Sequence, residues 1–427
     1  MANENATILL YLAVLLIYSD TDLLAPNLSD CAASFHFSEL EKDEKLGGGL
    51  SMGVFLVGAP AAFSLGCLAD GFVSRTKLLI IILVIGGTGC LLSAVAPNYE
   101  CLFAARSLTG VSIAGAMPLS YALATGWHRP SQRLIVSSQL GVCSSIGVMG
   151  GQFISGTLGS RYGWRIPFVV VGSTILAGAV VLWRYLPQST TLQSARRRMR
   201  QKQTLSLSQW SSLLRCKSYW LLLLQGIPGC VPWSVFGTFL PDYLHVNVGY
   251  TVAEATLIIV IFNFGVLLGT LVTGHIGQWL YNRSSKYPSL LMVAAGLLRI
   301  PLVCHLFDVP QTLGASCRLA LVAGFLSAPT GALVRPTLSN VVLPNQLGVA
   351  FASFVLTDDL GRGGGPFVVS KLGSERHQAF TRAMYCWVPN ALLGGMTYFT
   401  VVRDEANVKR CILNEKEEQG DNVSVIL

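Results

Sequence analysis

Long apolar stretches separated by short polar ones recur along the whole chain. The hydrocarbon core of a bilayer is about 30 Å thick, and a helix of about 20 apolar residues crosses it. Twelve stretches have this length, and they are too long and too weakly alternating to be the strands of a membrane barrel. We therefore predict twelve transmembrane helices, at about 7–26, 47–69, 77–96, 99–124, 134–158, 166–186, 218–241, 251–281, 287–307, 314–341, 346–370 and 379–402.

Composition agrees with an all-α polytopic membrane protein. Hydrophobic residues make up 52% of the chain and charged residues 12%, whereas a soluble domain carries about 25% charged residues. We expect the first stretch to be a transmembrane helix and not a cleaved signal peptide. It begins with Glu4 where a signal peptide has basic residues, and Asp20 and Asp22 follow it without a small-residue cleavage pattern.

The loops differ in charge. The connection "QSARRRMRQKQTLSLSQWSSLLRCK" contains basic residues and no acids, whereas the first loop, "DCAASFHFSELEKDEK", is acidic. Because Lys and Arg accumulate on the cytoplasmic side, we predict that both termini and the connection 187–217 are cytoplasmic. A basic segment beside an anionic leaflet also explains the net charge of +8 without nucleic acid.

The basic connection divides the predicted helices into six and six. We expect an N-terminal half at 1–186, a linker at 187–217, a C-terminal half at 218–402 and a cytoplasmic tail at 403–427. A trace of repetition supports two like-oriented halves, because Gly66 and Arg75 follow the second stretch of the first half with the same spacing as Gly274 and Arg283 in the second.

The segment "GCLADGFVSR" resembles the signature loop between helices two and three of the major facilitator superfamily (MFS). Gly66, Asp70 and Arg75 agree with that signature, and Gly71, Val73 and Ser74 depart from it. The segments "RSLTGVSIAGAMP" and "YGWRIPF" are also similar to the family, as are the glycines of the fifth stretch. The resemblance implies the MFS fold of two six-helix pseudo-repeats, with Asp70 as a latch that releases when the halves switch.

Within that family, "YSDTDLLAPNLSD" and the Asp-Gly-Pro grouping of the eleventh stretch look most like the spinster branch. That branch is implicated in moving lysophospholipids and sphingoid lipids. Ile113 stands where spinster-type sequences usually have a glutamate. The missing glutamate argues against the spinster branch and against proton coupling through an acid at this position.

Several charges fall inside the predicted spans. At 1.5 Å per residue, Asp20, Asp22 and Arg106 reach similar depths, and the segment "TDDLGRGGGP" brings Asp358, Asp359 and Arg362 to the same region. An unpaired charge there costs at least about 2.5–3.5 kcal/mol. We expect Asp358 and Arg362, four residues apart on one helix, to face one another.

These charges are candidate substrate or ion-coupling residues, and Gly363, Gly364 and Gly365 are a candidate hinge. The alternative is a self-neutralised structural pair, with the glycines serving only close packing. By resemblance, Gln225 and Trp233 of the seventh stretch line the transport pathway; alternatively they are core residues. The candidate conformational switch comprises Gly66, Asp70, Arg75 and these three glycines. We assign no role to Arg299.

The sequence contains no pattern of an enzyme. It has no Gly-Lys dipeptide for a P-loop, no HExxH and no GxSxG, and its eleven cysteines are scattered without ligand spacing. We therefore expect no cofactor and no metal. We expect a monomeric secondary transporter in the lipid bilayer, with a small-molecule or lipid substrate and H+ or Na+ as candidate coupling ions. The rival interpretation is a non-transporting receptor or scaffold that keeps the fold.

Overall fold

The computed structural model of the chain describes residues 2–71, 74–127, 130–186, 213–308, 312–343, 346–372 and 375–418. We call residues 2–186 the N-terminal half and 213–418 the C-terminal half. In the first, the long helices are α1 (Ala2–Tyr18), α4 (Leu50–Gly71), α5 (Arg75–Val95), α6 (Tyr99–Trp127), α7 (Pro130–Ile154) and α9 (Arg165–Tyr185). Shorter pieces connect them: η1 (Ala25–Asn27), α2 (Leu28–Ser34), α3 (Glu39–Glu41), α8 (Ser160–Tyr162) and the π-helices η2 (Lys42–Gly49) and η3 (Ser155–Gly159).

The C-terminal half has the same character. Its helices are α12 (Lys217–Leu224), α13 (Gly226–Tyr243), α14 (Val252–Arg283), α15 (Tyr287–Asp308), α16 (Leu313–Val341), α17 (Leu347–Leu372), α18 (Arg376–Met384), α19 (Trp387–Met396) and α20 (Val401–Glu418). The π-helix η4 (Leu244–Val248) and the short η5 (Thr397–Phe399) complete it.

The all-α prediction of twelve spans is confirmed. Eight of the predicted stretches fall in described helices that are each long and apolar enough to cross a membrane, between Glu39–Ala62 and Leu313–Val341. The other four coincide with α1, α7, α17 and the pair α18 and α19. α17 carries Asp358, Asp359 and Arg362, which lower its mean hydropathy.

Helix ends follow from local chemistry. The Ser74 side chain accepts a hydrogen bond from the Lys77 backbone N–H and so starts α5. Thr251 and Glu254 form a reciprocal capping box at the start of α14. Gly249 lies beyond η4 with φ of 91°, in the left-handed region that glycine adopts without a steric penalty.

The order of packing repeats between the halves. In the N-terminal half α4 packs on α6, α5 on α6 and α9, and α1 on α7. In the C-terminal half α14 packs on α16, α15 on α16 and α19, and α13 on α17. Glycines at matching places allow this: a Cβ on Gly110 of α6 would collide with the Val54 carbonyl of α4, and one on Gly324 of α16 with the Phe262 carbonyl of α14.

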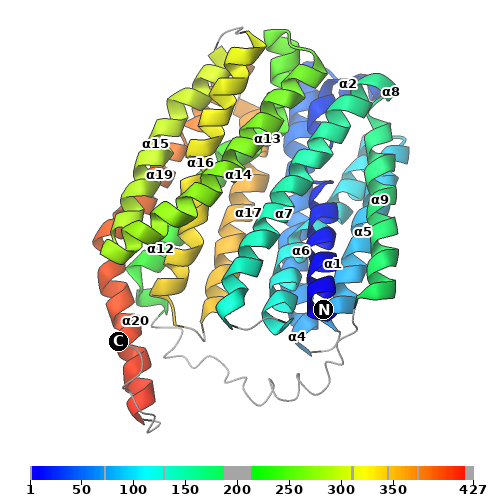
Figure 1. Cartoon of the computed structure of the whole chain (residues 1–427). Helices are drawn as coiled ribbons and strands as arrows, with labels where there is room; N and C mark the ends of the chain where they lie inside the picture. Colours follow the sequence, from blue (N-terminus) through cyan, green and yellow to red (C-terminus); the bar gives the residue numbers. More distant parts are fainter. Residues whose placement is uncertain are drawn as a thin grey trace.

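Both ends of the described chain lie on the same side of the bundle, which we call the terminal side, and α2 and α8 lie on the opposite, far side (Figure 1). The halves meet where α17 packs on α4 and η2, α14 on α7, and α13 on η1. The contacts include Gly48 with Ser370, and Phe55 with Gly363. These residues belong to η2 and to the far-side parts of α4 and α17, so the far side is closed in this conformation.

Candidate functional site

A buried ion pair joins α6 to the end of α1. Arg106 Nη1 lies 2.6 Å from Asp20 Oδ1, and the two side chains are 5% and 2% exposed. Arg106 Nη2 also donates to the carbonyls of Asp20 and Thr21, at 3.0 and 3.3 Å. The carbonyls of residues just beyond α1 have lost their helical partners, and Arg106 supplies donors to them. The pair therefore fixes the bend after α1 and leaves the guanidinium with little capacity for a ligand.

Asp22 points toward the other half. Its Oδ2 atom lies 3.5 Å from where a Cβ on Gly237 of α13 would stand. It interacts electrostatically with Arg362 of α17 and, within its own half, with Arg106 and Asp20. Asp22 and Arg362 are thus opposite charges contributed by different halves to the same region of the bundle.

Arg362 is a cation with acids around it but without an ion pair among the described residues. Asp358 and Asp359 both interact with it electrostatically, yet no ion pair in the described part of the chain joins it to either of them. Cys230 of α13 interacts with both Arg362 and Asp358. The Arg362 Nε atom is buried without a hydrogen-bond partner among the described residues. The direct Asp358–Arg362 contact expected from their spacing is not formed here.

The three glycines after Arg362 lie in unbroken helix, since α17 continues from Leu347 to Leu372 with Pro366 inside it. A Cβ on Gly363 would lie 2.9 Å from Phe55 Cβ of the other half, and one on Gly365 would lie 2.9 Å from Val231 Cα of α13. Gly364 has open space beside it. In this conformation Gly363 and Gly365 allow α17 to pack closely on α4 and α13, and the helix is not bent at these glycines.

Gln225 and Trp233, the two candidates from the seventh stretch, pack within the C-terminal half. Gln225 is 3% exposed and accepts a hydrogen bond from Asn390 of α19. The Trp233 ring lies 5.8 Å from that of Phe262, which also contacts Phe236 at 4.3 Å. These contacts are those of core residues.

The signature segment is described only in part. Gly66 and Asp70 belong to α4, but their surroundings lie outside what the structure describes. Arg75 donates from Nη1 to the Ala122 carbonyl at 3.1 Å, which ties the start of α5 to α6 within the N-terminal half. The latch expected at Asp70 remains a prediction.

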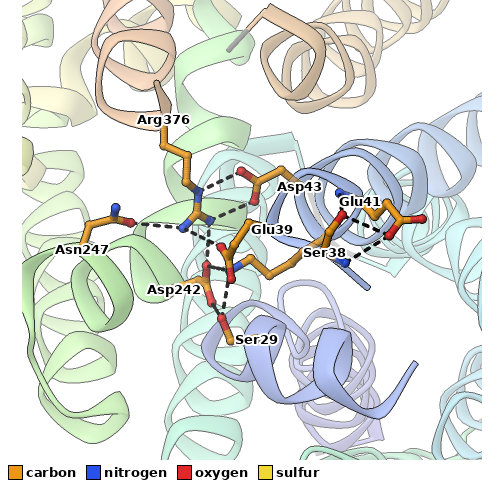
Figure 2. Close-up of polar contacts among 9 residues, drawn as sticks. Ser29, Ser38, Glu39, Glu41, Asp43, Asp242, Asn247 and Arg376 are labelled. Carbon is orange, nitrogen blue, oxygen red and sulfur yellow. Dashed lines mark hydrogen bonds and ion pairs between the residues drawn. The ribbon is translucent and has the colours of Figure 1, made fainter. Parts of the chain in front are cut away.

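A second group of charges joins the halves on the far side (Figure 2). Lys42 Nζ lies 3.0 Å from Asp242 Oδ2 at the end of α13, and each side chain is 1% exposed. Arg376 Nε and Nη2 reach the two carboxylate oxygens of Asp43 at 2.8 and 2.9 Å. We call this group the far-side network; its members are Ser29, Glu39, Lys42, Asp43, Asp242, Asn247 and Arg376.

The network also contains pairs within each half. Lys42 Nζ lies 2.6 Å from Glu39 Oε2, and Arg376 Nη2 lies 2.7 Å from Asp242 Oδ2. Ser29 Oγ accepts from Lys42 at 2.9 Å and donates to Asp242. The cross-half pairs are Lys42–Asp242, Asp43–Arg376 and the longer Glu39–Arg376 at 4.0 Å. They can separate while each cation keeps a carboxylate of its own half. Burial would make an unpaired charge costly, so this division lowers the barrier to opening.

The far-side network is not evident from the sequence. Lys42 and Asp43 stand in the acidic loop "SELEKDEK", and Asp242 is a lone acid at the end of an apolar stretch. That lone acid was an available signal, but of its partners Lys42 belongs to the other half and Arg376 lies 134 residues further along the chain. Among the described residues no cluster of three His, Cys, Asp or Glu side chains has the geometry to hold a metal ion.

Comparisons with known proteins agree with this architecture. Residues 10–366 match the Major Facilitator Superfamily. The 4-hydroxybenzoate transporter PcaK of Pseudomonas putida is 32% identical over 137 residues, which span 32% of this chain and 30% of that protein. An MFS-type efflux pump of Mycolicibacterium smegmatis is 26% identical over 333 residues, 73% of each chain.

Among solved structures, a bacterial homologue of the human lysosomal transporter Spinster, in an inward-facing and unoccupied conformation, has a TM-score of 0.71. It covers 97% of this chain and 98% of its own at 15% identity. This likeness concerns the fold alone. The match over residues 10–366, the repeated packing of the two halves and the twelve helical spans together establish that the chain belongs to the Major Facilitator Superfamily, whose members are transporters and not enzymes.

Proposed function

We propose that the chain is a secondary transporter that moves a small organic solute or a lysolipid-like amphiphile by alternating access of its two halves. The observation that carries this proposal is the far-side network. It closes one side through cross-half ion pairs, of which Lys42–Asp242 is fully buried, and each half retains a pair of its own when they separate. A protein whose halves do not move would not need each cation to have one carboxylate partner in its own half and another in the other half.

Opposite charges from the two halves mark the transport region. Asp22 of the N-terminal half and Arg362 of the C-terminal half interact there without a direct ion pair. Ionisable groups within membrane spans are expensive and usually mark a substrate or ion pathway. We propose that the Arg362 guanidinium binds an acidic group of the substrate, and that Asp22, Asp358 and Asp359 take part in coupling to H+ or Na+.

Two substrate classes fit this arrangement. A relative of this chain is a transporter of 4-hydroxybenzoate, an aromatic carboxylate that a free guanidinium would bind. A lysolipid also carries an acidic phosphate, and the spinster-like resemblance favours it. In both classes an anionic group lies beside an apolar body.

We further propose that the chain acts as a monomer with both ends and the connection 187–217 in the cytoplasm, which makes the far side the outer side. Thiol labelling from each face tests the orientation. Cys101 lies at the far-side start of α6 and Cys411 in α20, and both are exposed. Impermeant reagent added outside intact cells should label Cys101 and spare Cys411, and the opposite pattern would reverse the orientation.

Transport itself is tested in two steps. An untargeted comparison of solutes and lipids in cells with and without the chain nominates substrates. Purified protein in liposomes is then assayed with those substrates, with labelled 4-hydroxybenzoate and with a labelled lysophospholipid, under an H+ or a Na+ gradient. Saturable flux that Arg362→Ala removes supports the proposal. The receptor interpretation would be favoured if solute and lipid levels were the same in cells with and without the chain and if no tested substrate crossed the liposome membrane under either gradient.

A further inference from the structure

Arg299 of α15 is a buried cation without a carboxylate partner among the described residues. It is 3% exposed and takes part in none of the ion pairs in that part of the chain. Its guanidinium carbon lies 4.1 Å from the centre of the Trp387 ring of α19. A cation–π contact compensates part of the cost of burial. It does not by itself explain why the chain keeps an arginine at this place.

The hydrogen bonds of Arg299 connect three helices. Nη1 donates to the Ser327 carbonyl of α16 at 3.3 Å, and Nη2 donates to Asn390 Oδ1 of α19 at 2.9 Å. Arginine is a donor only, so the Asn390 side chain must present its oxygen to Arg299 and its NH2 group away from it. Arg299 therefore fixes the orientation of the Asn390 amide.

The oriented amide donates to the junction between α12 and α13. Asn390 Nδ2 lies 2.9 Å from the Gln225 backbone carbonyl and also donates to Gln225 Oε1. Gln225 Nε2 in turn donates to the Leu222 carbonyl at 3.1 Å. The hydrogen bonds thus run in one direction, from Arg299 through Asn390 and Gln225 to the last turn of α12.

The helix is interrupted at this junction, and the Asn390 donor adds to the backbone hydrogen bond that the Gln225 carbonyl already accepts from the Gly229 N–H at 3.0 Å. Pro228 has no N–H for the Leu224 carbonyl, four residues earlier, and Gly226 and Gly229 weaken the helix further. α12 ends at Leu224 and α13 starts at Gly226. Trp387 Nε1 adds a hydrogen bond to the Gly229 carbonyl at 3.1 Å. The Arg299 group thus holds the start of α13 from inside the C-terminal half.

α13 links the transport region to the far-side network. A Cβ on Gly226 would lie 2.5 Å from Asp358 Oδ1, and Cys230 interacts with Asp358 and Arg362. Near the other end, Gly237 faces Asp22, and Asp242 pairs with Lys42. A change in the direction of α13 at its start would therefore reach both charged groups.

We propose that Arg299 is a positioning residue that acts through Asn390 and Gln225: it sets the direction of α13 and thereby the balance between the closed and open far side. This inference rests on the proposed function, because it assigns Arg299 a part in the switching of a transporter. The chemistry required is a donor-only side chain at position 299, an amide at 390 and an acceptor at 225.

Asn390→Asp separates this proposal from simple neutralisation of a buried charge. The aspartate gives Arg299 a counter-ion but cannot donate to Gln225. The full chain is studied in lipid nanodiscs with spin labels at Leu40→Cys and Val246→Cys, in a background where Cys101 and Cys411 are serine. Leu40 and Val246 are exposed far-side residues of different halves, 57% and 45% exposed. Pulsed electron resonance measures the distance distribution, and thermal unfolding is measured on the same samples.

We expect Asn390→Asp to unfold at or above the temperature of the parent and to change the ratio of long to short distances about fivefold, because the Asn390 donor to Gln225 is lost. Arg299→Lys, which keeps a donor-only cation, should retain the parent ratio. A label pair within the N-terminal half, Leu40→Cys with Val95→Cys, should not change in any variant. An unchanged ratio in folded Asn390→Asp overturns the proposal.

Gln225→Met provides the second variant if Asn390→Asp does not fold. It removes the Gln225 side-chain acceptor and leaves the Arg299–Asn390 hydrogen bond in place. A shifted ratio supports the proposal, and the parent ratio in this variant overturns it. The readout is a conformational ratio and not flux. If the ratio shifts in a chain that transports nothing, the proposed function fails while the positioning role stands.

Discussion

Lys42 Nζ lies 3.0 Å from Asp242 Oδ2, and although the two residues belong to different halves, each side chain is 1% exposed. Lys42 sits in a π-helix before α4, and Asp242 in the last turn of α13. π-helical turns occur often at functional sites because they redirect side chains. The pair joins the halves at the side away from both chain ends, so the far side is the first place to test whether the halves move.

Removing one cross-half pair should favour the open far side. Lys42→Met leaves Asp242 paired with Arg376, and Asp43→Asn leaves Arg376 paired with Asp242. Each change removes one cross-half ion pair, so we expect the open-to-closed ratio to rise about tenfold. The Leu40 and Val246 label pair measures it. Lys45→Met, which breaks a half-exposed pair with Glu41 inside one half, is the control and should have no effect.

The Asp20–Arg106 pair should contribute mainly to stability. Asp20→Ala strands a buried guanidinium, and such a change destabilises a protein by about 3–5 kcal/mol. The double variant Asp20→Ala, Arg106→Met removes both charges and should recover most of that loss. Thermal unfolding in detergent measures both variants. A double variant as unstable as the single one would mean that the backbone contacts of Arg106, and not the ion pair, dominate.

Arg362 should affect transport more than stability. It makes no ion pair among the described residues, so Arg362→Ala strands no tightly bound carboxylate and should unfold within about 1 kcal/mol of the parent. Flux should nevertheless be lost. The double variant Asp358→Ala, Arg362→Ala restores neutrality, and we expect it to stay inactive. Flux at the parent rate in this double variant would mean that the segment "TDDLGRGGGP" has a structural role and does not take part in transport.

Asp70→Asn tests the latch implied by the signature segment. We expect normal insertion and folding, with slower flux and a changed ratio of open to closed far side, because a carboxylate near a helix N-terminus loses about 0.3–1 kcal/mol when it is neutralised. Flux and the label-distance ratio are measured together. Parent values for both would leave Asp70 as a loop acid without a role in switching.

The C-terminal helix provides a pH-dependent contact. Burial opposes ionisation of Glu405, but hydrogen bonds from Tyr281 and Lys409 outweigh it and lower the pKa of the Glu405 carboxyl. A lowered pKa means that the ionised group stabilises the fold above the ordinary value of 4.5, and this stability is lost as pH falls through the lowered pKa. Glu405→Gln should therefore flatten the acid limb of the unfolding temperature, measured from pH 7 to pH 3. An acid limb identical to the parent would contradict this.

The sequence predicts the fold well because membrane helices depend on local composition. Apolar stretches locate the twelve spans, although the last of them is divided between α18 and α19. Counting residues also places Asp20 and Arg106 at one depth, and the structure joins them at 2.6 Å. These predictions use only the rise of a helix and the cost of burying charge, which the sequence contains.

The candidate site is less predictable because its partners are distant in sequence. Spacing on one helix predicts an Asp358–Arg362 contact, but Cys230 of α13 interacts with both residues and Asp22 of the other half also interacts with the cation. The sequence alone gives no role for Arg299, because its hydrogen-bond partner Asn390 lies 91 residues further along the chain. Helical periodicity identifies which residues share a face, and it contains no information on which other helix covers that face.

The most direct test of alternating access is a reversible lock on the far side. In Asp43→Cys, Arg376→Cys, the two thiols replace a pair whose Nε and Oδ2 atoms lie 2.8 Å apart, and a short thiol-cleavable reagent can bridge them across the halves. Flux of the nominated substrate into liposomes is measured before bridging, after bridging and after cleavage with reductant. The account predicts that flux stops when the bridge forms and returns when it is cleaved, and flux that continues through the bridged chain would contradict it.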